Sequence, residues 1–166
     1  MYRTVQDFLD DWRYENLSTL KIFKNLTDES LSQKVSPEGR SLGFLAWHIV
    51  LSLGEMGDKA GLNVDAPAET TPQPNDASAI KEAYERAGAS LAAEIKENWN
   101  DPMLPEVILM YGEKWTRGAT LSALLKHQVH HRAQMTVLMR QAGLKVPGVY
   151  GPSQEEWKSL GMPVPQ

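Results

Sequence analysis

Four segments of this chain repeat apolar residues at the spacing of an α-helix, and this repeat constrains the fold more than any other feature. They cover approximately residues 4–26, 41–60, 76–99 and 120–142. A helix with an apolar stripe must bury that stripe against a neighbour, so four of them predict a helical bundle. The predicted core residues on the first three stripes are Val5, Phe8, Leu9, Trp12, Leu20, Phe23, Leu42, Leu45, Ile49, Leu53, Met56, Ile80, Tyr84, Ala87, Leu91 and Ile95.

Short polar side chains stand where each of these helices should begin. Thr4, Ser41, Asp76 and Thr120 are the predicted N-caps, because their oxygens can accept the free N–H groups of a first turn. Gly143 is the expected C′ residue of the fourth helix. The helix boundaries are therefore predicted from local chemistry alone.

A long connection, "NVDAPAETTPQPN" at residues 63–75, separates the second and third helices. It is rich in Pro and Thr and has no periodicity, so it reads as a crossover loop within one domain. Such a crossover frees these two helices from being adjacent antiparallel neighbours. We therefore predict an all-α fold, a four-helix bundle with a long crossover loop between helices 2 and 3, as a single domain over residues 1–166.

Two regions are less regular. Residues 100–118 include "EVILMYGEKWTRG", which allows either a short β-hairpin or an irregular loop. In the tail, Ser153 followed by Glu156 forms a capping-box pattern, and Gly161 lies where a short helix would end. We therefore predict a short C-terminal helix after the four helices of the bundle.

Composition narrows the function classes. The chain has no cysteine, which removes disulfides, thiolate ligands and a cysteine nucleophile. Its 17 basic and 21 acidic residues give a net charge of −4 without any basic run, so nucleic acid is not an expected partner. No apolar stretch is long enough for a bilayer, and the acidic N-terminus lacks a secretion signal. We expect no membrane partner and a cytoplasmic location.

The motif "HQVHHRAQ", residues 127–134, concentrates three of the four histidines. At about 100° per residue, His127 and His131 lie about 40° apart on the apolar arc that also holds Leu138. His130 falls on the flank of this arc, and Arg132 points nearly opposite, which suggests an ion pair or a dimer contact. The pair at i and i+4 is either two hydrogen-bonded core histidines or part of a metal site.

His48, beside the apolar face of the second helix, strengthens the metal interpretation. In a bundle it can reach the same point as His127 and His131, which predicts a divalent-metal site with three imidazole ligands. Such a site leaves a coordination position open and is typical of catalytic centres that activate water or a thiol. The metalloprotease motif His-Glu-x-x-His, the inward glutamates of di-iron bundles and a nucleophile elbow are all missing.

Other polar residues near these helix faces allow two interpretations each. Gln134 could orient a metal ligand or lie on the flank, and Glu55, two turns after His48, could act similarly or be solvated. Glu15 and Asn16 interrupt the apolar stripe of the first helix. They either form a locally solvated face or line a polar pocket. No catalytic acid or base is named by the sequence.

The segment "HQVHHRAQMTVLMRQAGLKVPGVYG", preceded by His48, resembles the DinB/YfiT-like superfamily over nearly the whole chain. Ala133 stands where that family often has glycine, which leaves the ligands unchanged. The resemblance implies a four-helix bundle, often a homodimer, with zinc or nickel held at His48, His127 and His131. Some relatives are thiol-dependent enzymes, among them a bacillithiol S-transferase and a mycothiol-dependent maleylpyruvate isomerase. Many members have no known activity.

These observations favour a metal-dependent enzyme of thiol S-transferase or hydrolase type. It would act on a small-molecule electrophile, with a low-molecular-weight thiol as the co-substrate of a transferase. The alternative is a non-catalytic stress-response or interaction protein whose metal only stabilises the bundle. A module that binds a small molecule or nucleic acid is a third interpretation, and the acidic composition disfavours DNA.

Overall fold

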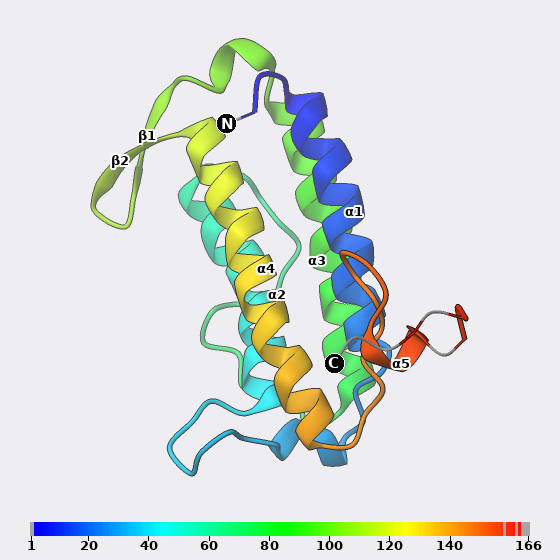
Figure 1. Ribbon diagram of the computed structural model, residues 1–166. Coiled ribbons are helices and arrows are strands. Elements are labelled where there is room, and N and C mark those ends of the chain that lie inside the picture. Colours follow the sequence, from blue (N-terminus) through cyan, green and yellow to red (C-terminus); the bar gives the residue numbers. More distant parts are fainter. Residues whose placement is uncertain (1, 158, 162, 164–166) are drawn as a thin grey trace.

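The computed structural model describes residues 2–157, 159–161 and 163, and four long helices make up most of it (Figure 1). The bundle is formed by α1 (Val5–Phe23), α2 (Leu42–Lys59), α3 (Ala77–Asn98) and α4 (Arg117–Gln141). This confirms the all-α four-helix bundle. The smaller elements are η1 (Glu29–Ser32), η2 (Asp101–Met103), β1 (Val107–Met110), β2 (Glu113–Thr116) and α5 (Gln154–Trp157).

The crossover loop makes α2 and α3 run in the same direction. It turns back along α2, where Val64 contacts Gly57 and the carbonyl of Thr71 accepts a hydrogen bond from Trp47 Nε1 at 2.8 Å. It thereby returns to the end of the molecule at which α2 began, and α3 starts from there (Figure 1). As a result, α2 packs antiparallel to α4, and this pair carries the candidate site.

Three of the four predicted N-caps are confirmed. Thr4 accepts from the N–H of Asp7 and forms a full capping box, while Ser41 and Asp76 also accept first-turn N–H groups. The prediction that Thr120 caps the fourth helix was wrong. The cap is Thr116, at the end of β2, so the chain passes directly from strand to helix. Thr120 is buried one turn later.

The region that the sequence left open forms a β-hairpin. β1 and β2 pair antiparallel, with Met110 opposite Glu113. Tyr111 and Gly112, the two residues of the turn, have φ of 53° and 81°. Positive φ at both positions is typical of the tight turns that match the twist of a two-stranded ribbon. The hairpin projects from the start of α4 (Figure 1) and brings Tyr111 and Trp115 beside the bundle.

The core follows the predicted stripes. All the predicted core side chains are buried except Leu9 and Leu20, which are partly buried and pack against the core. The interior includes Trp12, Phe23 and Tyr84, with the rings of Phe23 and Tyr84 5.0 Å apart. Burial of these side chains supplies the main stabilisation of the bundle.

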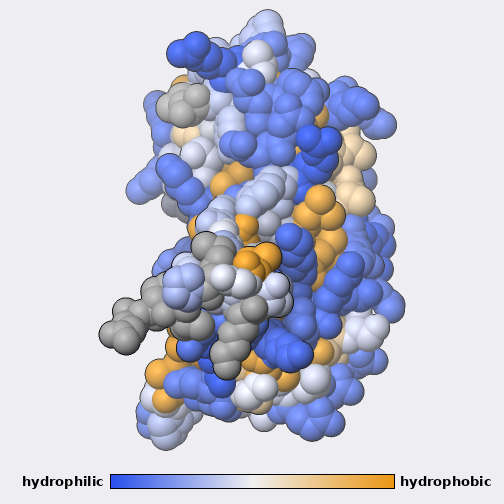
Figure 2. Space-filling model, turned by 45° about the vertical axis from the view of Figure 1, so that its right-hand side comes forward, coloured by the Kyte–Doolittle hydropathy of each residue, from blue (hydrophilic) through white to orange (hydrophobic). Residues whose placement is uncertain are grey.

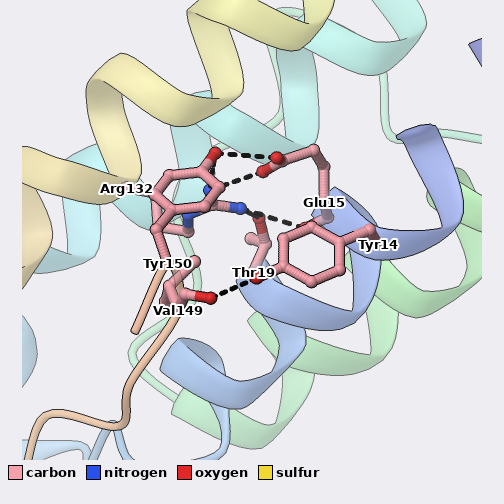
Figure 3. Close-up of polar contacts among 6 residues, drawn as sticks. All are labelled: Tyr14, Glu15, Thr19, Arg132, Val149 and Tyr150. Atoms are coloured by element: carbon pink, nitrogen blue, oxygen red, sulfur yellow. Dashed lines mark hydrogen bonds and ion pairs between the residues drawn. The ribbon is translucent and has the colours of Figure 1, made fainter. Parts of the chain in front are cut away.

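Glu15 lies in the interior, so its interpretation as part of a solvated face was wrong. Its exposed fraction is 7%, and its carboxylate accepts hydrogen bonds from Arg132 Nη2 and from the Tyr150 hydroxyl (Figure 3). The Arg132 guanidinium also donates to the Glu15 carbonyl at 3.0 Å and to Thr19 Oγ1 at 3.2 Å. A buried charge requires such a full set of partners. Asn16, the neighbouring residue, lines a surface hollow between α1 and α3.

The chain after α4 folds back over α1 and completes this polar cluster. Tyr150 lies over the Arg132 guanidinium and stacks on Tyr14, whose hydroxyl donates to the carbonyl of Val149 (Figure 3). Beyond it, the Glu156 carboxylate accepts the N–H of Ser153, which is half of the predicted capping box. The short α5 follows, as predicted, but it ends at Trp157, and residues 159–161, where the helix was expected to end, form a turn.

On the face shown in Figure 2, hydrophilic side chains predominate and the apolar ones form small separate areas. Within the described part of the chain, no helix combines the length and the apolarity needed to cross a membrane.

Candidate metal centre

His48 on α2 and His127 and His131 on α4 meet between the two antiparallel helices. His127 Nε2 lies 3.1 Å from His48 Nε2 and 3.1 Å from His131 Nε2. The three ring centroids are 4.5 to 4.9 Å apart and the rings meet edge to face. We call these three residues the histidine triad. The structure therefore brings together the three residues that the sequence selected as metal ligands.

Hydrogen bonding among neutral rings does not account for this arrangement. A neutral imidazole nitrogen either carries a hydrogen or offers one lone pair, so His127 Nε2 can form only one strong hydrogen bond in its ring plane. It nevertheless faces two other Nε2 atoms at the same distance. At least one of these contacts therefore lacks a hydrogen bond in the metal-free protein.

The donor set fits a divalent transition metal. Zinc binds imidazole nitrogen at about 2.0–2.1 Å, which places nitrogens at two corners of a tetrahedron about 3.3 Å apart. The observed contacts of 3.1 Å are close to this value. Three imidazoles also leave one corner free, as in catalytic rather than structural zinc sites. Among the described residues, the histidine triad is the group of three side chains whose potential metal-binding atoms all lie within 4.8 Å of one another.

Electrostatics keeps the triad in the neutral form that binds metals. Burial lowers the pKa of His127 to about 4, and the neighbouring imidazoles and Arg40 add to the shift. Burial also lowers the pKa of His48 and of His131, with His131 and Arg40 contributing at His48. Metal ions compete with protons for these nitrogens, so lowered pKa values favour metal binding near neutral pH.

Gln134 has the contact expected of a residue that orients a ligand. Its Oε1 lies 2.7 Å from His131 Nδ1, one turn along α4. An amide oxygen can only accept, so Nδ1 carries the hydrogen and the lone pair is at Nε2, toward the triad. His127 differs, because its Nδ1 is buried with no hydrogen-bond partner among the described residues.

Glu55 lies near the triad, but no hydrogen bond joins the two in the described part of the chain. It lines a hollow of about 350 Å³ together with His48, His127, Tyr111 and other side chains. Burial raises the pKa of Tyr111 to about 12, and the negative charge of Glu55 adds to the shift. Glu55 thus faces the hairpin and the hollow rather than orienting His48.

A second hollow, of about 340 Å³, lies beyond the triad toward the end of α4, and the residues described as lining it do not include the triad histidines. It is lined by residues near the start of α2 and the end of α4, among them Arg40, Leu45 and Val137, and by Gln134. The hollow that contains Glu55 uses the opposite ends of both helices. Because α2 and α4 are antiparallel, the two hollows flank the triad. We name them the Arg40 hollow and the Glu55 hollow.

Sequence reasoning missed several residues of this region. Arg40 and Phe44 border the triad: the guanidinium lies 5.1 Å from the Phe44 ring centroid, and that ring stacks on His48. Gln128 is fully buried, and its Nε2 donates to the carbonyl of Ile49 at 3.2 Å, which fixes α4 against α2 beside His48. A polar residue inside the apolar arc was the available signal for Gln128. His130 is exposed, as its flank position predicted.

The antiparallel helices α2 and α4 present three imidazoles between two hollows, so the fold is a helical bundle with a candidate metal site. Comparison with known proteins identifies its family. The sequence pattern of the DinB family matches residues 1–164. The uncharacterized protein YrdA of Bacillus subtilis is 42% identical over 166 residues, which is all of this chain and 99% of that protein. The chain belongs to the DinB family.

Solved structures agree with this assignment. A DinB-like protein from Bacillus cereus superposes with a TM-score of 0.87 at 41% identity, over 90% of this chain and all of that one. A second DinB-like protein, YjoA from Bacillus subtilis, has a TM-score of 0.65 at 18% identity, over 82% of this chain and 92% of its own, which shows the shared fold.

Proposed function

We propose that this protein is a metal-dependent enzyme that transfers a small thiol to a small electrophile. The observation that supports it most is the convergence of three Nε2 atoms from two helices between two hollows. Zinc or nickel would be held by His48, His127 and His131, since imidazole suits both metals. A bound divalent cation lowers the pKa of a coordinated thiol or water and so supplies a nucleophile at neutral pH.

The two hollows suit a reaction with two substrates. One substrate can approach the triad from each side, which holds the sulfur and the electrophilic carbon near each other. In the transfer, the sulfur forms a bond to that carbon and the leaving group departs with its electron pair. The thiol must also lose its proton. Hydrolysis of a small ester or amide at the same position is the related alternative, with water in place of the thiol.

We assign Glu55 as the general base that accepts this proton. Its carboxylate can accept a hydrogen from a thiol or water that enters beside His48 and His127. The Tyr111 hydroxyl can donate a hydrogen bond in the same hollow, which Tyr111 lines. Trp115 and Met56 add an apolar wall that limits access of bulk water.

The partial exposure of His48 and His127 favours an enzyme over a protein with a purely structural metal. Structural zinc sites are closed by four protein ligands, and here the described part of the chain offers three. The proposal also includes a homodimer, taken from the family resemblance, and light scattering of the purified protein tests that part.

Metal analysis followed by turnover measurements tests the function. We expect protein purified without a nickel column to contain close to one equivalent of zinc or nickel. It should consume a panel of small electrophiles in the presence of bacillithiol, glutathione or coenzyme A, and chelation should abolish this activity. His130→Ala serves as the matched control for His48→Ala, because His130 is exposed outside the triad. Bound metal without turnover on either thiol-transfer or hydrolysis substrates would favour the non-catalytic alternative.

A further inference from the structure

Arg40 is a cation at the edge of the triad that forms no ion pair with any residue the structure describes. It lies just before α2, with its guanidinium over Phe44, and Phe44 stacks on His48. In the part of the chain that the structure describes, no carboxylate lies within ion-pair distance of it. Arg40 is exposed and stands one aromatic ring away from His48. The guanidinium is therefore available to a ligand.

Among the described residues that line the Arg40 hollow, Arg40 is the charged one. The triad supplies three neutral ligands, so a bound divalent cation keeps its full positive charge, and Arg40 adds another. The Glu55 carboxylate belongs to the opposite hollow. An anionic group between Arg40 and the triad would neutralise part of this charge. Arg binds carboxylates through two parallel hydrogen bonds, which makes it the side chain suited to this task.

The rest of the Arg40 hollow is apolar. Val35, Leu45, Val137 and Leu138 line it, and Val35 and Val137 are exposed. Its volume, about 340 Å³, lies in the range of small-molecule sites, which runs from roughly 300 to 1,000 Å³. An apolar group that enters this hollow would cover side chains that now contact water. One end of the hollow thus favours an anion and the remainder favours hydrocarbon.

We infer that the Arg40 hollow binds a small carboxylic acid with an apolar body, its carboxylate on the Arg40 guanidinium and its hydrocarbon against Val35, Leu45, Val137 and Leu138. This inference rests on the proposed function, because it assigns this acid as the electrophilic substrate of the metal site. The thiol then enters through the Glu55 hollow, whose carboxylate and tyrosine hydroxyl suit a polar molecule. Arg40 is a specificity residue in this scheme and takes no part in bond formation.

Binding of model acids to the zinc-loaded protein tests the inference without an activity assay. Zinc content is measured first by mass spectrometry, and dissociation constants for butyrate and hexanoate follow from ligand-observed NMR titrations. Two additional methylenes in the hollow should tighten binding roughly tenfold. The neutral analogue 1-hexanol should bind far more weakly than hexanoate. Arg40→Gln should retain zinc and weaken hexanoate binding about tenfold or more, because a charge-assisted hydrogen bond is lost.

Lys114→Gln is the matched control, since it removes the same charge from β2, outside the hollow. It should leave hexanoate binding unchanged, and Arg40→Lys should restore part of the affinity. Equal affinities for butyrate and hexanoate, or equal affinities in wild type and Arg40→Gln, overturn the inference while the metal site stands. If glutathione loses more affinity than hexanoate in Arg40→Gln, Arg40 serves the thiol and the assignment is overturned. A protein that takes up no zinc at the triad overturns the proposed function and the inference with it.

Discussion

Arg132 Nη2 donates a hydrogen bond to Glu15 Oε2 in the interior between α4 and α1, one residue along the chain from the triad residue His131. Adjacent residues of a helix point about 100° apart, so α4 presents His131 to α2 and Arg132 to α1. The motif "HHRAQ" thereby fixes α4 on two sides. The contribution of the Arg132–Glu15 ion pair to stability can therefore be tested separately from metal binding at His131.

Arg132→Met should destabilise the protein by about 3–5 kcal/mol, because Glu15 would be left buried without its partner. Urea unfolding of the metal-free protein measures this loss. Arg140→Met is the control, since Arg140 pairs with Glu155 at a partly exposed position and should cost less than about 1 kcal/mol. Similar losses in the two variants would contradict the structural role assigned to Arg132.

Gln134→Leu should lower the affinity for zinc about 10- to 100-fold, because His131 Nδ1 loses the acceptor that orients its ring. Competition with a chromogenic chelator measures the affinity. Gln134 is exposed, so the metal-free melting temperature should change little. Gln141→Leu, an exposed change on the same helix, should leave zinc affinity as in the wild type. An unchanged affinity in Gln134→Leu would show that Gln134 does not orient the ligand.

Zinc should stabilise the folded protein. At a free zinc concentration 100 times the dissociation constant, the expected gain is about 2.7 kcal/mol, provided that the unfolded chain binds zinc weakly. Calorimetry with and without a chelator measures the shift in melting temperature. His48→Ala should abolish most of the shift, and His130→Ala should preserve it. A shift that survives in His48→Ala would place the metal elsewhere.

The metal-free protein should lose stability as the pH falls from about 6.5 to about 4. Burial lowers the pKa of His127 from 6.5 to about 4, so in this window the unfolded chain binds a proton that the folded one does not. Stability linked to His127 is therefore fully present above the unfolded pKa and decreases as the pH falls through the window. In His127→Gln, the free energy of unfolding measured with urea should decrease less steeply as the pH falls. Carboxylates titrate in both proteins, so their contribution cancels in the difference between wild type and variant. Identical slopes would contradict this assignment.

The sequence by itself determined the features that depend on local chemistry. Helical periodicity selected the core residues, because the stripe of a helix is fixed by its 3.6-residue repeat. Three N-caps could be read directly, since a side-chain oxygen and the following N–H groups lie within one turn. The same geometry placed His127 and His131 together, and their shared face with the core indicated that His48 could join them.

Only the tertiary structure decided which separate segments meet. Glu15 breaks the stripe of α1, and no local rule shows that Arg132, 117 residues later, and Tyr150 would satisfy its charge. Thr116 rather than Thr120 caps α4, because the hairpin delivers the chain to the helix one turn earlier. The Arg40 hollow and the Glu55 hollow each combine residues of α2 and α4, and the antiparallel packing of the two helices decides which residues of α4 join each hollow. Such pairings depend on long-range packing, to which sequence spacing contributes no information.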